Sequence, residues 1–136
     1  MEQILKEYDG KVRLVFKDLP LPIHNFARAA HEAARCAGAR GKYWPYHDRL
    51  FEEQPRFERE RLIAYAVDLG LDRAEFTRCM DERTHAAAVD RDLADARALG
   101  IKSTPTFLVN GQALVGAHPL ETFRLLIDDA LGKGRR

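Results

Sequence analysis

The hydrophobic positions follow a helical period through the middle of the chain and a strand-like period on either side of it. Between residues 23 and 99, apolar side chains recur three and four positions apart, which places them on one face of a helix. Asp72 with Glu75 three residues later is typical of a capping box, and Gly70 and Gly100 stand where helices commonly end. The pattern predicts helices over 24–39, 41–53 and 59–69, another that begins after Asp72, and another over 84–99.

The two ends of the chain have other patterns. Residues 1–8 fit the last turns of a helix, and the apolar run Lys11–Lys17 predicts a strand. Two shorter runs, at 106–109 and 113–115, flank Asn110-Gly111, a dipeptide typical of tight β-hairpin turns. A last helix is expected over 119–131, because its apolar residues form one stripe. This order of elements indicates an α/β fold with a helical insertion.

Composition and charge narrow the class of protein. A length of 136 residues suits one domain, and 46% hydrophobic with 32% charged residues is ordinary for a folded globular protein. A net charge of +1 predicts no nucleic-acid partner, and the short basic segment 133–136 is expected to be a solvated tail. No apolar run approaches the roughly 20 residues of a membrane span, so no membrane partner is expected either.

Several segments resemble, in order, a known family. Residues 103–111, which read Ser-Thr-Pro-Thr-Phe-Leu-Val-Asn-Gly, resemble the cis-proline loop of thioredoxin folds and the hairpin after it. A proline at the mouth of a strand cannot donate to the ladder, and a cis bond before it makes a tight turn. Further segments resemble the second strand, the helical insertion and the second hairpin strand of DsbA-like proteins: residues 11–21, 34–38, 41–51, 69–72 with Phe76 and Cys79, and 111–117.

The resemblance implies an α/β architecture, an incomplete DsbA-like thioredoxin fold with an all-helical insertion. The single domain would have its core at 1–22 and 100–136 and its insertion at 23–99. In this family a central first strand leads into a Cys-x-x-Cys, and this chain begins after that point. Thiol–disulfide exchange needs a thiolate of lowered pKa with a resolving thiol close by. We therefore expect a member truncated before its active site, without catalytic residues and inert in thiol exchange.

Thr104 and Pro105 are the candidate substrate-binding residues. In the family that the chain resembles, the backbone beside the cis-proline pairs with an extended substrate, a form of strand addition. The implied partner is an extended peptide or an unfolded protein. One alternative function is a non-catalytic interaction module that uses this same edge. A second alternative is a glutathione-dependent relative, whose own site would also precede residue 1.

Cys36 and Cys79 stand 43 positions apart, which is neither metal-ligand nor Cys-x-x-Cys spacing. They resemble a second cysteine pair of some DsbA-like proteins. Three alternatives remain for these two cysteines: a structural disulfide, two buried free thiols and a redox-active pair. Apolar neighbours in the sequence are expected to raise the pKa of both thiols. The five histidines lack the spacing of metal ligands and no phosphate-binding loop is present, so neither a metal nor another cofactor is expected.

The strand that the resemblance marks as missing would lie between the strands at 11–17 and 106–109. Its loss would leave unpaired backbone groups. The flanking strands could pair directly, two copies could complete the sheet, or a longer native protein could supply the strand; we expect a homodimer. The family suggests a periplasmic or other extracytoplasmic location. Residues 1–6 lack the apolar stretch of a signal peptide, which fits an unexported chain and equally a mature form whose leader has been removed.

Overall fold

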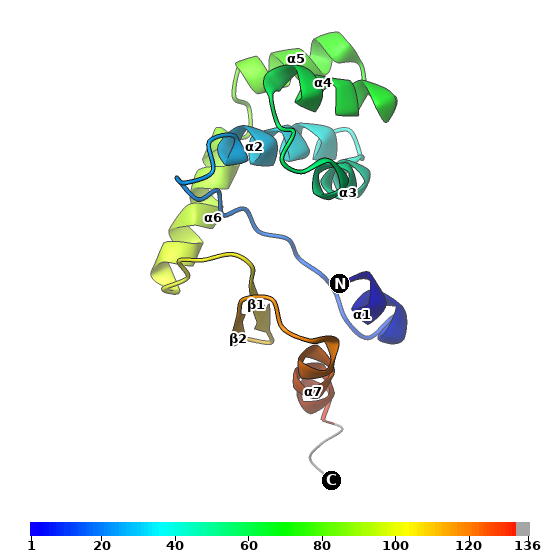
Figure 1. Cartoon of the computed structure of the whole chain (residues 1–136), viewed down its shortest axis with the longest axis vertical. Helices are drawn as coiled ribbons and strands as arrows, with labels where there is room; N and C mark the ends of the chain where they lie inside the picture. The colour runs from blue at the N-terminus through cyan, green and yellow to red at the C-terminus, as the bar shows by residue number, and fades with distance from the viewer. Residues whose placement is uncertain (133–136) are drawn as a thin grey trace. The chain divides into compact units, whose positions relative to one another are not determined.

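The computed structural model describes residues 1–132, and the expected basic tail at 133–136 lies outside the described residues. The chain forms two compact units, one made of Met1–Lys17 with Leu99–Arg136 and the other of Asp18–Ala98 (Figure 1). The first unit holds the hairpin and the two terminal helices, and the second is entirely helical. Among residues 1–132, no helix is long and apolar enough to cross a membrane.

The helical unit is built around one central helix. Its helices are α2 (Ala27–Gly38), α3 (Tyr43–Glu53), α4 (Arg59–Asp68), α5 (Arg73–Asp81) and α6 (Ala86–Ala98), and α2 packs against all of the others. Alanines dominate the buried face of α2, so neighbouring helices can approach it closely. The core of this unit consists of small α2 residues and larger side chains from α3 to α5: Ala30, Ala33, Ala34, Cys36, Ala37, Tyr46, Leu50, Leu62, Ile63, Tyr65, Ala66 and Phe76.

Local sequence signals place some of these helix ends and misplace others. The Asp72 carboxylate accepts a hydrogen bond from the backbone N–H of Glu75 at 2.9 Å, so the predicted N-cap of α5 is confirmed. Helix α2 begins at Ala27 instead of His24, because residues 21–27 are taken up by two backbone turns, Leu21 to His24 and His24 to Ala27. Helix α6 likewise starts at Ala86, two residues later than predicted.

The other unit contains α1 (Glu2–Glu7), β1 (Thr106–Val109), β2 (Gln112–Val115) and α7 (Leu120–Ala130). The strands form the expected antiparallel hairpin, in which Thr106 pairs with Val115 and Val109 with Gln112. Asn110 and Gly111 both have positive φ, 49° and 87°, as a type I′ turn requires. One hydrophobic core joins the two helices to the hairpin, with Ile4, Tyr8, Leu114, Phe123 and Ile127 buried.

The strand predicted at Lys11–Lys17 is wrong. The sheet of the described chain has two strands, β1 and β2, and residues 11–17 belong to none. Their exposure still alternates, with Val12, Leu14 and Phe16 half-buried between exposed neighbours. The sequence pattern therefore reports one covered face correctly, but a strand also needs a neighbour for its backbone groups, and β1 pairs with β2 alone. Direct pairing of residues 11–17 with β1 is excluded in the same way.

Candidate functional site

The loop before β1 holds the two residues that the sequence singled out for binding. Thr104 and Pro105 are both exposed, and the peptide bond between them is cis. Two hydrogen bonds fasten the loop on either side: the Thr106 hydroxyl donates to the Ser103 carbonyl at 2.8 Å, and the backbone N–H of Gly116 donates to the Pro105 carbonyl at 2.7 Å. The loop is thus tied to the end of β2.

Unlike its neighbours in the loop, Thr104 has backbone groups that are not hydrogen-bonded within the described residues. Within residues 1–132, neither its N–H nor its C=O makes a hydrogen bond to another part of the protein. Exposed backbone groups next to a strand are what strand addition uses, because an incoming extended chain can pair with them. Leu108 and Val115, which lie on one face of the hairpin as diagonal neighbours, are 47% and 60% exposed. The edge is therefore bordered by apolar surface.

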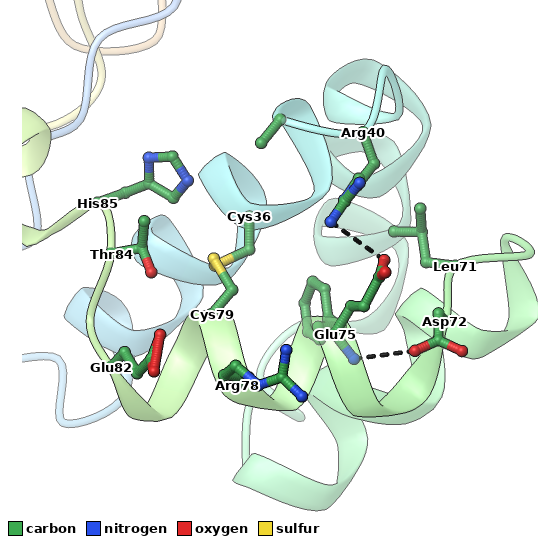
Figure 2. Close-up of a pocket in the computed structure, with 12 residues that line it drawn as sticks. Cys36, Arg40, Leu71, Asp72, Glu75, Arg78, Cys79, Glu82, Thr84 and His85 are labelled. Atoms are coloured by element: carbon green, nitrogen blue, oxygen red, sulfur yellow. Dashed lines mark hydrogen bonds and ion pairs between the residues drawn. A yellow bond between two sulfur atoms is a disulfide. The ribbon is translucent and has the colours of Figure 1, made fainter.

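The cysteines form a disulfide between two helices of the other unit. Cys36 on α2 and Cys79 on α5 are joined, with their Cα atoms 6.0 Å apart. Cys36 is buried and Cys79 is half-buried, so the bond lies at the edge of the helical core. The disulfide adjoins a surface pocket (Figure 2). The pocket has a volume of about 340 Å³ and is lined by Cys36, Ala39, Arg40, Leu71, Asp72, Glu75, Phe76, Arg78, Cys79, Glu82, Thr84 and His85.

The surroundings of this disulfide combine apolar and charged side chains, whereas the sequence predicted apolar neighbours. Alanines of α2 belong to the same core as Cys36, and Phe76 belongs to that core and also lines the pocket. The pocket lining also carries charge: Arg40 forms an ion pair with Glu75 at 3.1 Å, and Arg78 and Glu82 also line the cavity. Because the cysteines are bonded to each other, the two-free-thiol alternative does not describe this structure.

The turn after α5 brings further polar residues to the disulfide. The N–H of Thr84 donates to the Cys79 carbonyl at 3.2 Å and that of Arg83 donates to the Met80 carbonyl at 3.1 Å, the two bonds of a Schellman motif. Arg83 has a φ of +48°, the left-handed conformation that this motif needs. The chain therefore turns back after Cys79 and places His85 beside the sulfurs (Figure 2).

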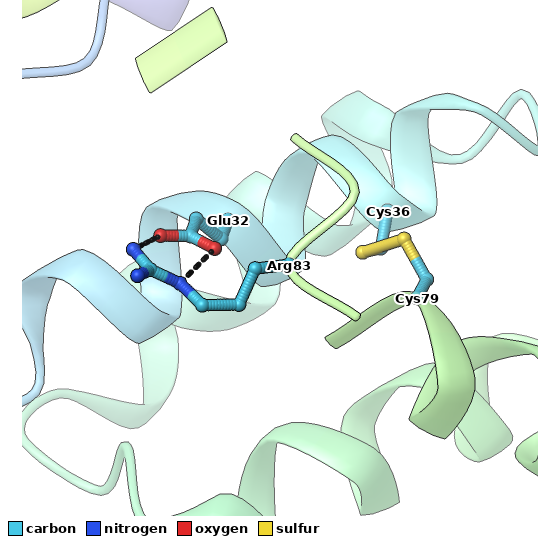
Figure 3. Close-up of a disulfide and its surroundings, with 4 residues drawn as sticks. All are labelled: Glu32, Cys36, Cys79 and Arg83. Carbon is cyan, nitrogen blue, oxygen red and sulfur yellow. Dashed lines mark hydrogen bonds and ion pairs between the residues drawn. A yellow bond between two sulfur atoms is a disulfide. The ribbon is translucent and has the colours of Figure 1, made fainter. Parts of the chain in front are cut away.

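An ion pair fixes that turn to α2. Arg83 donates to the Glu32 carboxylate at 2.6 and 3.2 Å, one helical turn from Cys36 (Figure 3). Glu32 is 5% exposed and also accepts from Arg28 at 2.9 Å. Burial alone would raise the pKa of the Glu32 carboxyl, but the hydrogen bonds from Arg83 and Arg28 outweigh it and hold the pKa below its usual value. Glu32 is therefore charged and forms a clamp, made of its hydrogen bonds to Arg83, between α2 and the turn after α5.

A second buried network joins α2 to α6. Asp18 is 2% exposed, lies 2.7 Å from His31 Nδ1, and accepts from Arg35 Nε at 2.5 Å. Arg35 also donates to Asp92 at 2.8 Å. Burial acts to raise the pKa of Asp18, and the His31 and Arg35 contacts lower it further than burial raises it. Because both carboxylates are paired with Arg35, we interpret the network as structural.

Sequence reasoning found Thr104, Pro105 and both cysteines but missed His85, Glu32 and Arg83. His85 follows Cys79 by six positions, which is not a helical spacing, and only the turn after α5 brings the two together. The other histidines lie elsewhere: His47 sits among aromatic rings of α3, 4.6 Å from Phe51, and His118 donates to the Val115 carbonyl at 2.7 Å. No local signal in the sequence marks the His85 position.

The described chain is a helix-rich α/β protein with a small two-stranded sheet and a cis-proline loop before its first strand. Residues 1–129 match the model of the thioredoxin family. The chain belongs to the thioredoxin family.

Bacterial proteins similar to this chain carry a different description. The chain is 39% identical over 108 residues to the Na(+)/H(+) antiporter NhaA of Herminiimonas arsenicoxydans, which covers 79% of this chain and 17% of that protein. It is 33% identical over 136 residues to Na(+)/H(+) antiporter NhaA 1 of Salinispora arenicola, covering 99% of this chain and 21% of that protein. The chain thus spans about a fifth of the length of these relatives. No solved structure matches it.

Proposed function

We propose that this chain is the substrate-binding part of a DsbA-like thiol–disulfide oxidoreductase domain, and that it binds an extended peptide without exchanging thiols. One observation carries the proposal. Thr104, an exposed residue two positions before β1, has an N–H and a C=O that no other described residue uses, in a loop that is tied in place. Membership of the thioredoxin family supports it, because that fold is associated with thiol–disulfide chemistry.

The chemistry of the edge indicates which peptides bind. Two backbone hydrogen bonds contribute only about 1–3 kcal/mol together. Additional affinity has to come from side chains that contact the exposed apolar residues Leu108 and Val115. The proposed ligand is therefore an extended segment with apolar side chains, as an unfolded protein presents it. The Na(+)/H(+) exchange named for the relatives belongs to much longer proteins, and we assign no ion exchange to this chain.

Binding of a fluorescently labelled, valine- and leucine-rich unstructured peptide, followed by anisotropy, tests this proposal. Thr104→Pro removes the backbone N–H and should weaken binding at least fivefold. Thr104→Ala keeps both backbone groups and serves as the matched control, with an affinity equal to that of the unaltered chain. The melting temperature of both variants shows that the hairpin is intact.

A second ligand makes the test independent of the variants. The same peptide with N-methylated amides keeps its side chains but cannot pair as a strand, and we expect it to bind at least fivefold more weakly. Equal binding of the methylated peptide, or of the Thr104→Pro variant, would show that the contact does not use this backbone edge.

A further inference from the structure

The disulfide pocket of the helical unit contains three ligand atoms of the kinds that zinc prefers. The Sγ atoms of Cys36 and Cys79 and a ring nitrogen of His85 all lie within 4.8 Å of one another. His85 is half-buried, and its ring makes no hydrogen bond to any residue among 1–132. Two thiolates and an imidazole form a common ligand set for Zn²⁺. All three residues belong to one compact unit, so their proximity is internal to it.

We propose that reduction of the Cys36–Cys79 disulfide creates a Zn²⁺ site made of Cys36, Cys79 and His85. As long as the sulfurs are bonded to each other, they are poor metal ligands, because metals bind the thiolate. Once the bond is broken, the sulfurs can separate to roughly 3.8 Å, the spacing of two thiolates on one tetrahedral zinc. The pocket of about 340 Å³ leaves room for water at the fourth position. The proposal concerns the helical unit and does not rest on the proposed peptide binding.

The clamp between α2 and the turn after α5 keeps the ligands together when the disulfide is open. Glu32 precedes Cys36 by four residues and lies on the same face of α2, and Arg83 follows Cys79 by four residues. Their hydrogen bonds hold the same two segments that the disulfide joins (Figure 3). The Schellman bonds from Thr84 and Arg83 keep His85 in place. The site is therefore preorganised by contacts that reduction leaves intact.

The reaction balances with a phosphine as reductant. The S–S bond breaks and accepts two electrons from phosphorus, which becomes a phosphine oxide by taking oxygen from water. The two protons of that water go to the sulfurs. Zn²⁺ then displaces both thiol protons, so metal binding releases two protons and strengthens as pH rises. A dithiol reductant would do the same and become a disulfide itself.

Cobalt(II) is the probe, because its thiolate charge-transfer and d–d absorption bands report sulfur ligation and tetrahedral geometry. The full chain is reduced with a phosphine under anaerobic conditions and titrated with Co²⁺, and Zn²⁺ is then added to displace it. We expect one Co²⁺ per reduced chain and none in the disulfide form. His85→Ala, which leaves the disulfide in place, should weaken binding at least tenfold. His24→Ala, at an exposed histidine of the same unit, is the control and should bind normally.

Two further readouts cover the case in which reduction disturbs the fold. Circular dichroism of the reduced chain should retain its helical signal, and Zn²⁺ should slow reoxidation of the thiols by at least tenfold. Absence of the thiolate band, unchanged binding in His85→Ala, or a reduced chain that loses its helices and binds no cobalt would each overturn the proposal.

Discussion

Glu32 and Asp18 are carboxylates that the protein buries and keeps charged. Each would be costly to bury alone, since burial disfavours the charged form. Arginine donors compensate: Arg83 and Arg28 hold Glu32, and Arg35 holds Asp18 together with His31. The pKa of both carboxyls is held below its usual value as a result. These residues therefore stabilise the fold only while they are ionised.

The free energy of unfolding should fall as pH drops below about 4.5, the ordinary pKa of a glutamic acid. A carboxyl whose pKa is lower in the folded than in the unfolded chain contributes stability above its unfolded pKa, and that contribution is lost as pH falls through the folded pKa. Urea unfolding from about pH 7 to about pH 3 measures the decline. Glu32→Gln should lose about 1–3 kcal/mol at neutral pH and decline less steeply in acid.

Glu52→Gln is the control for this experiment, because Glu52 is exposed on α3. It should follow the pH dependence of the unaltered chain. An acid decline in Glu32→Gln as steep as that of the unaltered chain would contradict the role given to Glu32.

Sequence reasoning at this scale could find residues with a local signal and could not find residues that act through distant partners. Asp72 was identifiable as an N-cap because its partner, Glu75, is three residues away. In the sequence Glu32 is one polar residue among the alanines of a helix. No local pattern marks its role, because its partner Arg83 lies 51 positions away. His85 could not be identified either, because only the turn after α5 brings it close to Cys79.

The turn between α5 and α6 is the element on which the disulfide pocket depends. Arg83 occupies its left-handed position, which glycine usually takes, and a non-glycine residue there costs roughly 1 kcal/mol. The two hydrogen bonds from its guanidinium to Glu32 offset that cost. Arginine at this position thus accepts an unfavourable backbone conformation and gains hydrogen bonds to α2.

Two substitutions at this position separate the two effects. Arg83→Ala keeps the unfavourable backbone and loses the link, so we expect the free energy of unfolding to fall by about 1–3 kcal/mol. Arg83→Gly loses the same link but relieves the backbone, and should be more stable than Arg83→Ala by roughly 0.5–1 kcal/mol. Urea unfolding of the disulfide form gives both values. An alanine variant as stable as the glycine variant would show that the backbone strain is negligible.

The elements differ in how well their sequences predicted them. The hairpin was predictable because Asn110-Gly111 directly joins the two strands and supplies both positive φ angles of the turn. Lys11–Lys17 was not, although its alternating exposure is that of a strand, because no sequence pattern says whether a partner strand lies beside it. Helical periodicity located α3, α4 and α7 to within a few residues. These helices and the hairpin were predictable for the same reason, because the contacts that define them are local in sequence.

At the scale of the whole molecule, the open outer edge of β1 is where we expect the chain to associate with a second copy. The two-stranded sheet of the described residues leaves β1 with one bonded neighbour, β2. We expect that without peptide a second copy covers this edge in a homodimer and that a bound peptide competes with it, because open strand edges promote pairing between chains. Multi-angle light scattering at micromolar concentration should give twice the mass of 15.5 kDa. A monomeric mass across the concentration range would contradict the dimer.

Our central proposal is that this chain of the thioredoxin family binds extended peptides and does not exchange thiols. Its two cysteines are bonded across α2 and α5, and no Cys-x-x-Cys occurs in its sequence. The reduction of insulin by dithiothreitol, followed by turbidity, tests this claim most directly. The account predicts the same rate with and without the protein. A faster rate that disappears in Cys36→Ser/Cys79→Ser would contradict it and would make the inter-helix disulfide a redox-active pair.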